Sequence, residues 1–544
     1  MFSIKPDEIS KKYYNFINNI VKTDFESEKV LGKYYTDLHM ARHMVNIICS
    51  NLNINSIPEC ISIIDPFCGD GRLILMLLDK LRNNNLLSNK SVLISAWDID
   101  EVALQKAKNT IIAFCNENKI SAKMDFRITD AFVSYSQVSN KYDICITNPP
   151  WSLLKPQKIF KGELDELTKT QYYEVLRQYD CYLKEEFQIS QPSSKFGQWG
   201  TNLARCGTEV ALCMIKNTGI CGVVSPASLF NDQVSKNLRK WIFQTHNVLN
   251  ISYYPAELKL FGIADISSVT IVVKKDGTQN HLTLEICHDN FNYSKEEVTN
   301  DIFNYIRWHG YTIPLKNGIK SIGILQCFDK LPSTLDYCKI IGATFVRELD
   351  ETRIKDKISL TGNIRFAKGY MVDRYTFNGD NVYINEEKVT IPSTAMLYKV
   401  VWRDVSRDSQ IRRIKATMLH PGFVCGNSLG TIVGNEDSIP YLKVLLAIMN
   451  SMVFEYQARN MLVSNHVSAG VIKKIHVPMP NLNTQIIELV DKKLKGENVD
   501  NELEVEVAKM YGISINEFED IIEIFKITDQ EKRALVSAFL NKNN

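Results

Sequence analysis

Short apolar segments alternate with helical patterns over the first 275 residues, and this alternation constrains the fold more than any other feature of the chain. Between the apolar segments, helical periodicity is evident at 73–83 and 101–116. Alternating strands and helices are typical of an α/β layer built on a mainly parallel sheet. The pattern fades after Lys275, and the last segment, 481–544, is helical and acidic. The expected strands are 61–64, 92–97, 142–147, 219–225, 249–253 and 268–274.

Length and composition narrow the class of protein. A chain of 544 residues is expected to form about two to four domains, because a single hydrophobic core stops growing well below that size. The polar segment 1–12 has no apolar signal core, and no apolar run reaches the roughly 20 residues that cross a bilayer. The 13 cysteines include no C-x-x-C pair and no zinc-like Cys/His spacing. We therefore expect a cytoplasmic protein with reduced thiols and no metal site, rather than a secreted or membrane-spanning one.

A glycine turn, 65–71 (Asp-Pro-Phe-Cys-Gly-Asp-Gly), directly follows the first expected strand and opens a helix. It is not the dinucleotide fingerprint, because Ile74 stands where the third glycine would be. Asp65 suits a ligand with an ammonium group. Asp98, which ends the second strand, can accept hydrogen bonds from a ribose, and Asp130 from an adenine amine. The alternative is a glycine turn with strand-end acids and no ligand.

The tetrapeptide Asn-Pro-Pro-Trp at 148–151 follows another apolar strand. The carbonyl groups of Asn148 and Pro149 can both accept from one exocyclic amine, which makes its nitrogen nucleophilic without a general base. Trp151 offers an aromatic face on which a planar base can stack. The alternative is a rigid proline turn followed by a packing tryptophan.

The order of the glycine turn and the 148–151 turn resembles that of gamma-class (TaqI-like) S-adenosylmethionine-dependent N6-adenine DNA methyltransferases. Upstream, 32–36 (Gly-Lys-Tyr-Tyr-Thr) resembles the N-terminal motif of that class, and downstream, Phe261 with 267–273 resembles a segment that packs on the extruded adenine. The basic part of the chain is similar to the recognition domain of adenine methyltransferases in type IIS restriction–modification systems. The resemblance covers roughly 30–480.

The resemblance implies S-adenosylmethionine as cofactor and direct methyl transfer to a flipped-out adenine, with no metal. Asp98 would hold the cofactor ribose, Ile99 would pack on its adenine, and Asp130 with the Ala131 backbone would read the adenine edge. Trp151 departs from the tyrosine that is usual in the family but keeps the stacking face. The implied catalytic residues are Asn148, Pro149, Pro150, Trp151 and Phe261. The implied cofactor-binding residues are Tyr35, Thr36, Asp65, Phe67, Gly69, Gly71, Asp98, Ile99, Asp130 and Ala131.

Charge is unevenly distributed although the whole chain carries only +2. Over 351–480, 17 Lys and Arg stand against 11 Asp and Glu, whereas over 481–544, 8 stand against 13. The basic part is either a solvated face or a surface that binds a polyanion. The candidate DNA-binding residues are Lys399, Arg403, Arg407, Arg412 and Arg413.

We therefore expect an α/β fold: a Rossmann-like class I methyltransferase domain with a mixed seven-stranded sheet, a C-terminal α+β target-recognition domain and a helical tail. The predicted ranges are 1–30 for an N-terminal helical segment, 31–345 for catalysis, 346–480 for target recognition and 481–544 for the acidic tail. The predicted partners of this monomer are double-stranded DNA and a separate restriction endonuclease.

Two other classes share these motifs: an RNA adenine or protein glutamine methyltransferase that uses the same turn, and a DNA-binding subunit with an inactive methyltransferase fold. Residues 152–207 are longer than catalysis requires and contain Lys155, Lys158 and Lys161. We expect either a loop that closes over DNA or a surface insertion.

Overall fold

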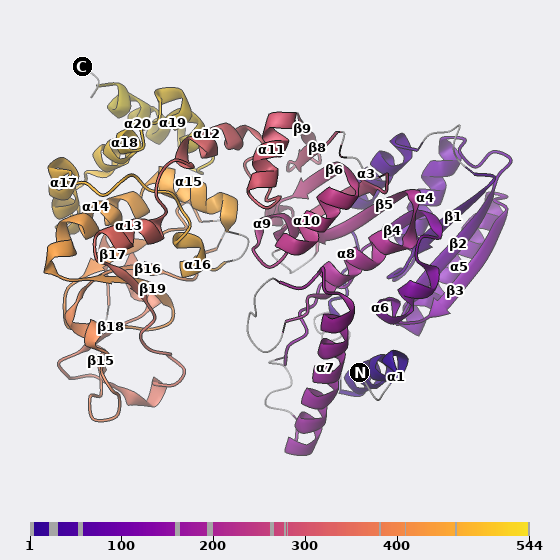
Figure 1. Ribbon diagram of the computed structural model, residues 1–544, viewed down its shortest axis with the longest axis horizontal. Helices are drawn as coiled ribbons and strands as arrows, with labels where there is room; N and C mark the ends of the chain where they lie inside the picture. The colour runs from indigo at the N-terminus through magenta and orange to yellow at the C-terminus, as the bar shows by residue number, and fades with distance from the viewer. Residues whose placement is uncertain are drawn as a thin grey trace. The chain divides into compact units, whose positions relative to one another are not determined.

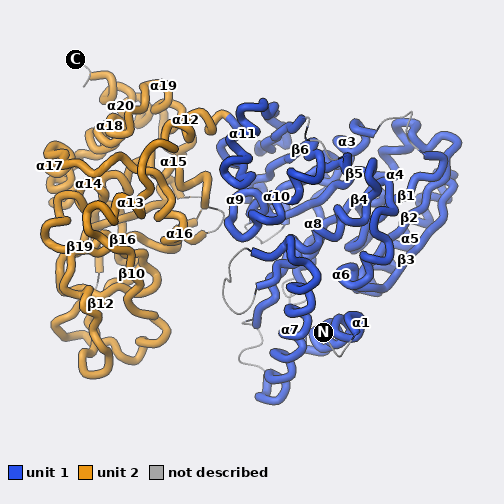
Figure 2. The backbone as a smooth tube through the Cα atoms, in the orientation of Figure 1, with its two compact units in different colours: residues 1–319 blue, residues 320–544 orange. Residues whose placement is uncertain are grey.

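The computed structural model describes residues 5–20, 31–52, 58–157, 164–192, 200–261, 266–276, 279, 281–379, 382–407, 410–462 and 465–541 (Figure 1). The chain divides into two compact units, Met1–Ile319 and Lys320–Asn544 (Figure 2). The division falls ahead of residue 345, the end of the predicted catalytic domain. The functions predicted for the two parts remain predictions.

A nine-stranded mixed sheet organises the first unit, in the order β3-β2-β1-β4-β5-β7-β6-β8-β9. Strands β3, β2, β1, β4 and β5 are parallel, and β7 runs antiparallel to both β5 and β6. The strands are β1 (Cys60–Asp65), β2 (Ser91–Asp98), β3 (Ala122–Ile128), β4 (Tyr142–Thr147), β5 (Ile215–Pro226), β6 (Asn247–Tyr254), β7 (Ser268–Lys274), β8 (Thr283–Cys287) and β9 (Tyr293–Glu297).

The mixed α/β architecture is as predicted, but the number of strands is not. The expected class I methyltransferase fold has seven strands, whereas the sheet continues through β8 and β9, which pair antiparallel beyond β6. The reason lies in β9, whose sequence Tyr-Ser-Lys-Glu-Glu is mostly exposed and polar. A strand at the edge of a sheet buries little surface, so it carries no apolar signal.

Helices cover the sheet. Helices α3 (Leu38–Ser50), α4 (Arg72–Asn83) and α5 (Glu101–Glu117) share one hydrophobic core with the strands. Helix α8 (Leu203–Met214) packs on β4 and β5, and α10 (Lys236–Thr245) packs on β6. The other helical segments of this unit are α1 (Pro6–Ile20), α6 (Ala131–Ser134), η2 (Tyr135–Val138), α7 (Glu166–Glu186), α9 (Ser228–Asn231), η4 (Ala256–Leu258) and α11 (Asn300–Trp308).

Helices α1 and α7 lie side by side (Figure 1). The rings of Tyr13 on α1 and Tyr179 on α7 stack with centroids 4.7 Å apart, and those of Phe16 and Tyr172 stack at 6.2 Å. Helix α7 belongs to the segment that the sequence marks as an insertion. The N-terminal helix and the insertion therefore pack together.

The second unit combines two four-stranded sheets, a two-stranded sheet and a large helical part. The order β10-β19-β16-β17 forms an antiparallel sheet, and β11-β15-β12-β18 forms a mixed one. The strands are β10 (Thr344–Val346), β11 (Ile358–Ser359), β12 (Arg365–Ala367), β13 (Val372–Asp373), β14 (Thr376–Phe377), β15 (Tyr383–Ile384), β16 (Tyr398–Arg403), β17 (Ala416–Leu419), β18 (Phe423–Cys425) and β19 (Leu429–Gly434).

The acidic tail shares its core with the rest of this unit. One hydrophobic cluster runs from Ile324 to Phe539 and includes residues of the sheet and of the tail helices. The helices are α12 (Lys320–Phe328), α13 (Thr334–Ile340), α14 (Ile439–Met449), α15 (Met452–Met461), α16 (Ala469–Ile472), α17 (Thr484–Leu494), α18 (Asp500–Met510), α19 (Ile515–Glu523) and α20 (Asp529–Asn541). The shorter 3-10 turns are η5 (Lys355–Lys357), η6 (Gly369–Met371), η7 (Ser393–Met396) and η8 (Glu436–Ser438).

Candidate cofactor and base-binding site

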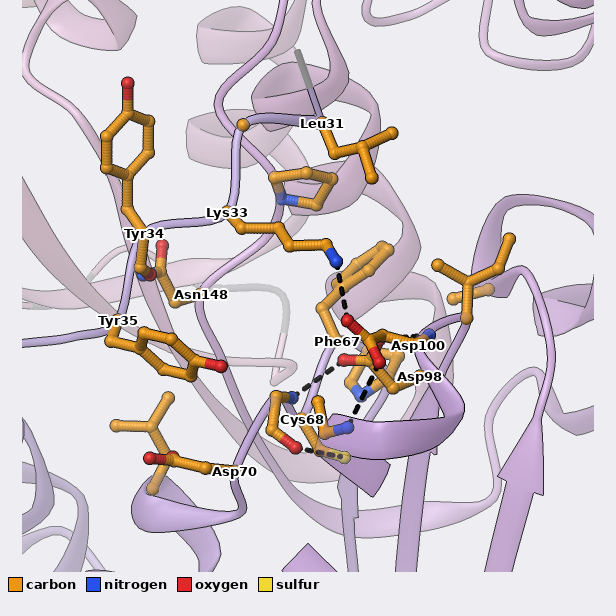
Figure 3. A pocket seen from close by; sticks show the side chains of 18 of the residues that line it. Leu31, Lys33, Tyr34, Tyr35, Phe67, Cys68, Asp70, Asp98, Asp100 and Asn148 are labelled. Atoms are coloured by element: carbon orange, nitrogen blue, oxygen red, sulfur yellow. Dashed lines mark hydrogen bonds and ion pairs between the residues drawn. The ribbon is translucent and has the colours of Figure 1, made fainter. Parts of the chain in front are cut away.

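A cavity lies where the turns after β1, β2, β3 and β4 meet, at the carboxyl ends of these parallel strands. Open α/β sheets bind ligands at this edge. Figure 3 shows side chains that line the cavity, with Lys33 extending toward Asp100. Asn148 and Pro150, two of the predicted catalytic residues, also line it. The predicted cofactor residues that line it are Tyr35, Thr36, Phe67, Gly69, Asp98, Ile99, Asp130 and Ala131.

Asp98 is held by the glycine turn. Its carboxylate accepts hydrogen bonds from the backbone N–H groups of Gly69 and Asp100, each at 2.8 Å. Burial raises the pKa of Asp98, and these two bonds oppose that increase. A carboxylate that is fixed on one side and faces a cavity on the other can accept hydrogen bonds from ligand hydroxyls.

Gly71 and Asp65 do not line the cavity, although both are predicted to bind the cofactor. Gly71 has a φ of +79°, and a Cβ there would come within 2.9 Å of the Cβ of Ala107 on α5. This glycine therefore allows α4 and α5 to pack closely, which is a structural role. The residue of the pair that approaches the cavity is Gly69.

Asp65, the first residue of the glycine turn, is fully buried. Its Oδ1 accepts from the Thr147 hydroxyl at 2.6 Å and from the Phe67 N–H at 3.1 Å, while its Oδ2 has no partner. Burial raises the pKa of Asp65 to about 7. An orphaned carboxylate oxygen next to a cavity is suited to a cationic ligand group, because such a group would restore a lost interaction.

Lys33 was not among the predicted site residues. Its ammonium group lies 2.6 Å from a carboxylate oxygen of Asp100 (Figure 3). Burial acts to raise the pKa of Asp100, but the hydrogen bond and charge of Lys33 and the N–H groups of Ala103 and Val102 together outweigh it, and the pKa is lowered. The ion pair joins the 32–36 segment to the turn after β2, so segments about 67 residues apart in sequence form one wall.

Asn148 is oriented by the backbone of Tyr34. Its Nδ2 donates to the Tyr34 carbonyl at 2.7 Å, and its Oδ1 is buried without a partner. The next part of the turn is tied to the same segment, because the Trp151 N–H donates to the Gly32 carbonyl at 3.0 Å. A Cβ on Gly32 would lie 2.6 Å from the Trp151 carbonyl carbon. The amide therefore presents a fixed, free acceptor.

Three aromatic side chains gather beside this amide. The ring centroids of Trp151 and Phe261 lie 4.5 Å apart, and the ring centroid of Tyr34 lies 5.6 Å from that of Trp151 and 6.1 Å from that of Phe261. Trp151 and Phe261 were expected to share a pocket, although their motifs are more than 100 residues apart in sequence. Tyr34 was missed, because nothing in the 32–36 motif distinguishes its ring from that of Tyr35.

Pro149 fits against a glycine of α8. A Cβ on Gly207 would lie 2.2 Å from the Pro149 Cβ and 3.2 Å from the Phe67 ring. The Leu203 N–H at the start of the same helix donates to the Ser152 carbonyl at 2.9 Å. Helix α8 thus supports the turn from behind, and Gly207 is a site residue that the sequence did not reveal.

Three of the predicted DNA-binding residues are buried in ion pairs or hydrogen bonds of the second unit. Lys399 is inaccessible and its ammonium lies 2.8 Å from Glu348. Arg412 lies 2.7 Å from Glu504, and the Arg413 guanidinium donates to the Ser406 carbonyl at 3.1 Å. A DNA phosphate cannot reach these groups without breaking those pairs. These three side chains are therefore not surface cations, and their contact with DNA remains a prediction.

The other two residues of that set differ from each other. Arg403 is half-buried and donates to the carbonyls of Gly369 at 3.0 Å and Val372 at 3.0 Å. Arg407 is exposed. Only Arg407 of the five predicted residues is therefore fully at the surface. A positive excess in the sequence did not indicate a basic surface, because much of it is neutralised inside the unit.

Residues 152–207 contain helix α7 and the start of α8. Lys155 is exposed, whereas Lys158 and Lys161 lie outside the described residues. Within the described ranges, no three His, Cys, Asp or Glu side chains are arranged to hold a metal ion. In the same part of the chain, no single helix has the length and apolarity to cross a membrane, although the bent pair Glu436–Met449 and Met452–Met461 meets both criteria when joined.

Comparison with known proteins finds a family match for a segment that contributes part of this site. Residues 71–261 match the model of the Eco57I restriction-modification methylase family. This segment is similar to restriction-modification methylases. A stretch of 130 residues is 28% identical to the Type II methyltransferase M.VspI of Vibrio sp. (strain 343) and covers 23% of the chain and 27% of that relative. The match therefore spans about a quarter of the relative's length.

Solved structures with a similar fold include restriction-modification enzymes. The Type IIL enzyme MmeI in complex with DNA is 12% identical, with a TM-score of 0.51 over 99% of this chain and 81% of that one. A DrdV–DNA complex is 11% identical, with a TM-score of 0.53 over 90% of this chain and 59% of that one. At these identities the similarity concerns the fold.

Proposed function

We propose that this protein is a site-specific DNA methyltransferase that transfers a methyl group from S-adenosylmethionine to the N6 amine of an adenine. The observation that carries the proposal is the Asn148 amide. Its Nδ2 is engaged by the Tyr34 carbonyl at 2.7 Å, which leaves Oδ1 as a buried acceptor without a partner. An exocyclic amine supplies the missing donor. The adjacent rings of Trp151 and Phe261 suit a planar base.

The cavity fits the proposed cofactor. Asp98 faces it with free acceptor positions for the two ribose hydroxyls, and Ile99 lies beside it for contact with a purine ring. Asp65, the first residue of the glycine turn, has an unpartnered Oδ2 that a methionine ammonium group would satisfy. Bound S-adenosylmethionine would supply an electrophilic methyl group.

The residues of the chain would act by orientation. Asn148 Oδ1 and the Pro149 carbonyl accept from the amine and draw its lone pair out of conjugation with the ring. Trp151 and Phe261 hold the base after it has left the duplex, which costs a few kcal/mol of unstacking and unpairing. Catalysis of this kind depends on positioning and on fixed dipoles in a dry site. No cysteine nucleophile takes part.

Double-stranded DNA is the proposed substrate. The similarity of residues 71–261 to restriction-modification methylases supports it. The likeness of the fold to two proteins solved with DNA, one of them the restriction-modification enzyme MmeI, also supports it. We further propose that the second unit recognises the target sequence, with Arg407 as its candidate contact, and that a separate endonuclease of the same system cleaves unmodified sites. The protein is proposed to act as a cytoplasmic monomer.

The experiment is methylation of genomic DNA with labelled S-adenosylmethionine, followed by single-molecule sequencing that maps N6-methyladenine. Asn148→Ala should abolish transfer while S-adenosylhomocysteine still binds with near wild-type affinity. Asn109→Ala, at an exposed position of α5, is the matched control and should remain active. Label in RNA or protein but not in DNA would refute the proposed substrate. Substantial turnover by Asn148→Ala with normal DNA affinity would refute the role of the amide.

A further inference from the structure

Asp130 is held by two hydroxyl groups that come from outside the cavity. Its Oδ2 accepts from Ser10 Oγ on α1 at 2.7 Å and from the Tyr179 hydroxyl on α7, also at 2.7 Å. Neither Ser10 nor Tyr179 lines the cavity, whereas Asp130 does. The two helices that carry these hydroxyls are the N-terminal helix and the insertion helix. The fold thus places a second layer of residues behind this one carboxylate.

The remaining acceptor positions of Asp130 can be counted. A carboxylate oxygen accepts about two hydrogen bonds in its plane, so the two hydroxyls fill Oδ2. The other oxygen, Oδ1, accepts from the Phe132 N–H at 3.0 Å, because Asp130 is also the N-cap of α6. One acceptor position therefore remains, on Oδ1. Rotation of the carboxylate would break the bonds to Ser10 and Tyr179, so that position is fixed.

We propose that Ser10 and Tyr179 are positioning residues that make Asp130 selective for the exocyclic amine of the cofactor's adenine. The inference rests on the proposed function, because it assumes that the adenine of the cofactor occupies this end of the cavity. An amine donates to the free position of Oδ1. A ring without that amine leaves this position unpaired, and a buried acceptor without a donor is costly.

The environment of Asp130 explains why two hydroxyls are needed. Burial raises the pKa of this carboxyl, and the bonds from Ser10 and Tyr179 act in the opposite direction. Hydrogen bonds to the ionised form favour it. Without the hydroxyls, this half-buried carboxyl would be free to rotate or to take up a proton, and its remaining acceptor would no longer be fixed toward the ring.

A simple packing role makes a different prediction. The ring of Tyr179 also stacks on Tyr13 and packs edge-on against Tyr14, so removal of the whole side chain would loosen α1. Loosening of α1 would lower the affinity of the cavity for every ligand by a similar factor. Loss of the positioning role would lower the affinity only for ligands that carry the amine. The two roles are therefore separated by the ratio of two affinities.

The test is a cycle of two ligands and several variants, read by isothermal titration calorimetry. The ligands are S-adenosylhomocysteine and its 6-deamino analogue, in which purine replaces adenine. Wild type should bind the first at least about tenfold more tightly, as expected for one hydrogen bond to a charged group. In Tyr179→Phe and in Ser10→Ala, that ratio should fall about threefold or more, and in the double variant it should approach one.

Tyr172→Phe is the matched control. Tyr172 lies on the same helix, its ring stacks on Phe16 of α1, and its hydroxyl accepts from the Gln157 N–H at 3.2 Å, away from Asp130. In the Tyr172→Phe variant, the ratio of the affinities for the two ligands should equal that of wild type. Wild-type ratios in Tyr179→Phe and Ser10→Ala, with melting temperatures that show folded proteins, would overturn the inference alone. Failure of wild type to bind S-adenosylhomocysteine would instead overturn the proposed cofactor.

Discussion

Gly207→Ala tests whether α8 sets the position of the proposed catalytic turn. The added Cβ would lie 2.2 Å from the Pro149 Cβ, 3.0 Å from its Cγ and 3.2 Å from the Phe67 ring. Non-bonded carbon atoms are most stable at about 3.5–4.0 Å. Relief of the first contact therefore requires a movement of roughly 1.3 Å or more.

The turn cannot move that far without losing its own bonds. The Trp151 N–H is bound to the Gly32 carbonyl at 3.0 Å, and the Leu203 N–H of α8 is bound to the Ser152 carbonyl at 2.9 Å. Overpacking of this kind costs about 1–3 kcal/mol of unfolding free energy. A misplacement of about 1 Å at a reacting centre costs about 100-fold in rate. We therefore expect the rate of methyl transfer to fall by about 100-fold. The affinity for S-adenosylhomocysteine should fall by a smaller factor.

The assay is single-turnover methylation of DNA, with calorimetric binding of S-adenosylhomocysteine and chemical unfolding measured on the same preparations. Gly323→Ala is the matched control, because no atom lies within 4 Å of its added Cβ and the residue is in helix α12. The control should be fully active and slightly more stable, since alanine favours a helix by up to about 1 kcal/mol. A Gly207→Ala enzyme with wild-type turnover would refute the argument that α8 sets the turn.

Two further predictions concern stability. Glu504→Gln should lower the unfolding free energy by about 2–3 kcal/mol, because it removes a charged partner from buried Arg412 at 2.7 Å. Asp500→Asn removes ion pairs with Lys493 and with Arg374 at a partly exposed position, so it should change the unfolding free energy by less than about 1 kcal/mol. Equal effects of the two variants in denaturant titrations would contradict this. Burial raises the pKa of Asp65 from 3.8 to about 7, so as pH rises this carboxyl ionises in the unfolded chain before it does in the folded protein. The contribution of Asp65 to the unfolding free energy, up to about 4 kcal/mol, is therefore complete below about pH 4 and is lost by about pH 7. Asp65→Asn should flatten this dependence between about pH 4 and pH 7, and an unchanged slope would show that Asp65 is not its source.

The central strands of the sheet could be predicted because their sequences are continuous apolar runs. The segments 142–147 and 268–274 coincide with β4 and β7, and 92–97 lies within β2. Strands that are buried on both faces have this pattern, so their sequence alone identifies them. β9 could not be predicted, because an exposed edge strand of polar residues has no such pattern.

The residues that line the cavity were largely predictable, but those that support them were not. Turns at the carboxyl ends of parallel strands meet at one edge, so the strand-end motifs identified Asp98, Asp130 and Asn148 without a structure. Ser10 and Tyr179 reach Asp130 from positions 120 and 49 residues away in sequence. No local pattern records such a contact, because it depends on how α1 and α7 pack.

The positive excess of 351–480 did not indicate a basic surface, for a related physical reason. Residues of the basic part pair with residues of the acidic tail: Arg412 with Glu504 at 2.7 Å, and Lys443 with Asp491 at 2.6 Å. The opposite charges of the two segments therefore stabilise the packing of the tail helices within one core, and they cancel where they meet. A linear charge count cannot separate such pairs from a surface that faces DNA. If the proposed function is correct, contacts with a phosphate backbone come mainly from exposed cations. Arg407 is the exposed one among the five predicted DNA-binding residues.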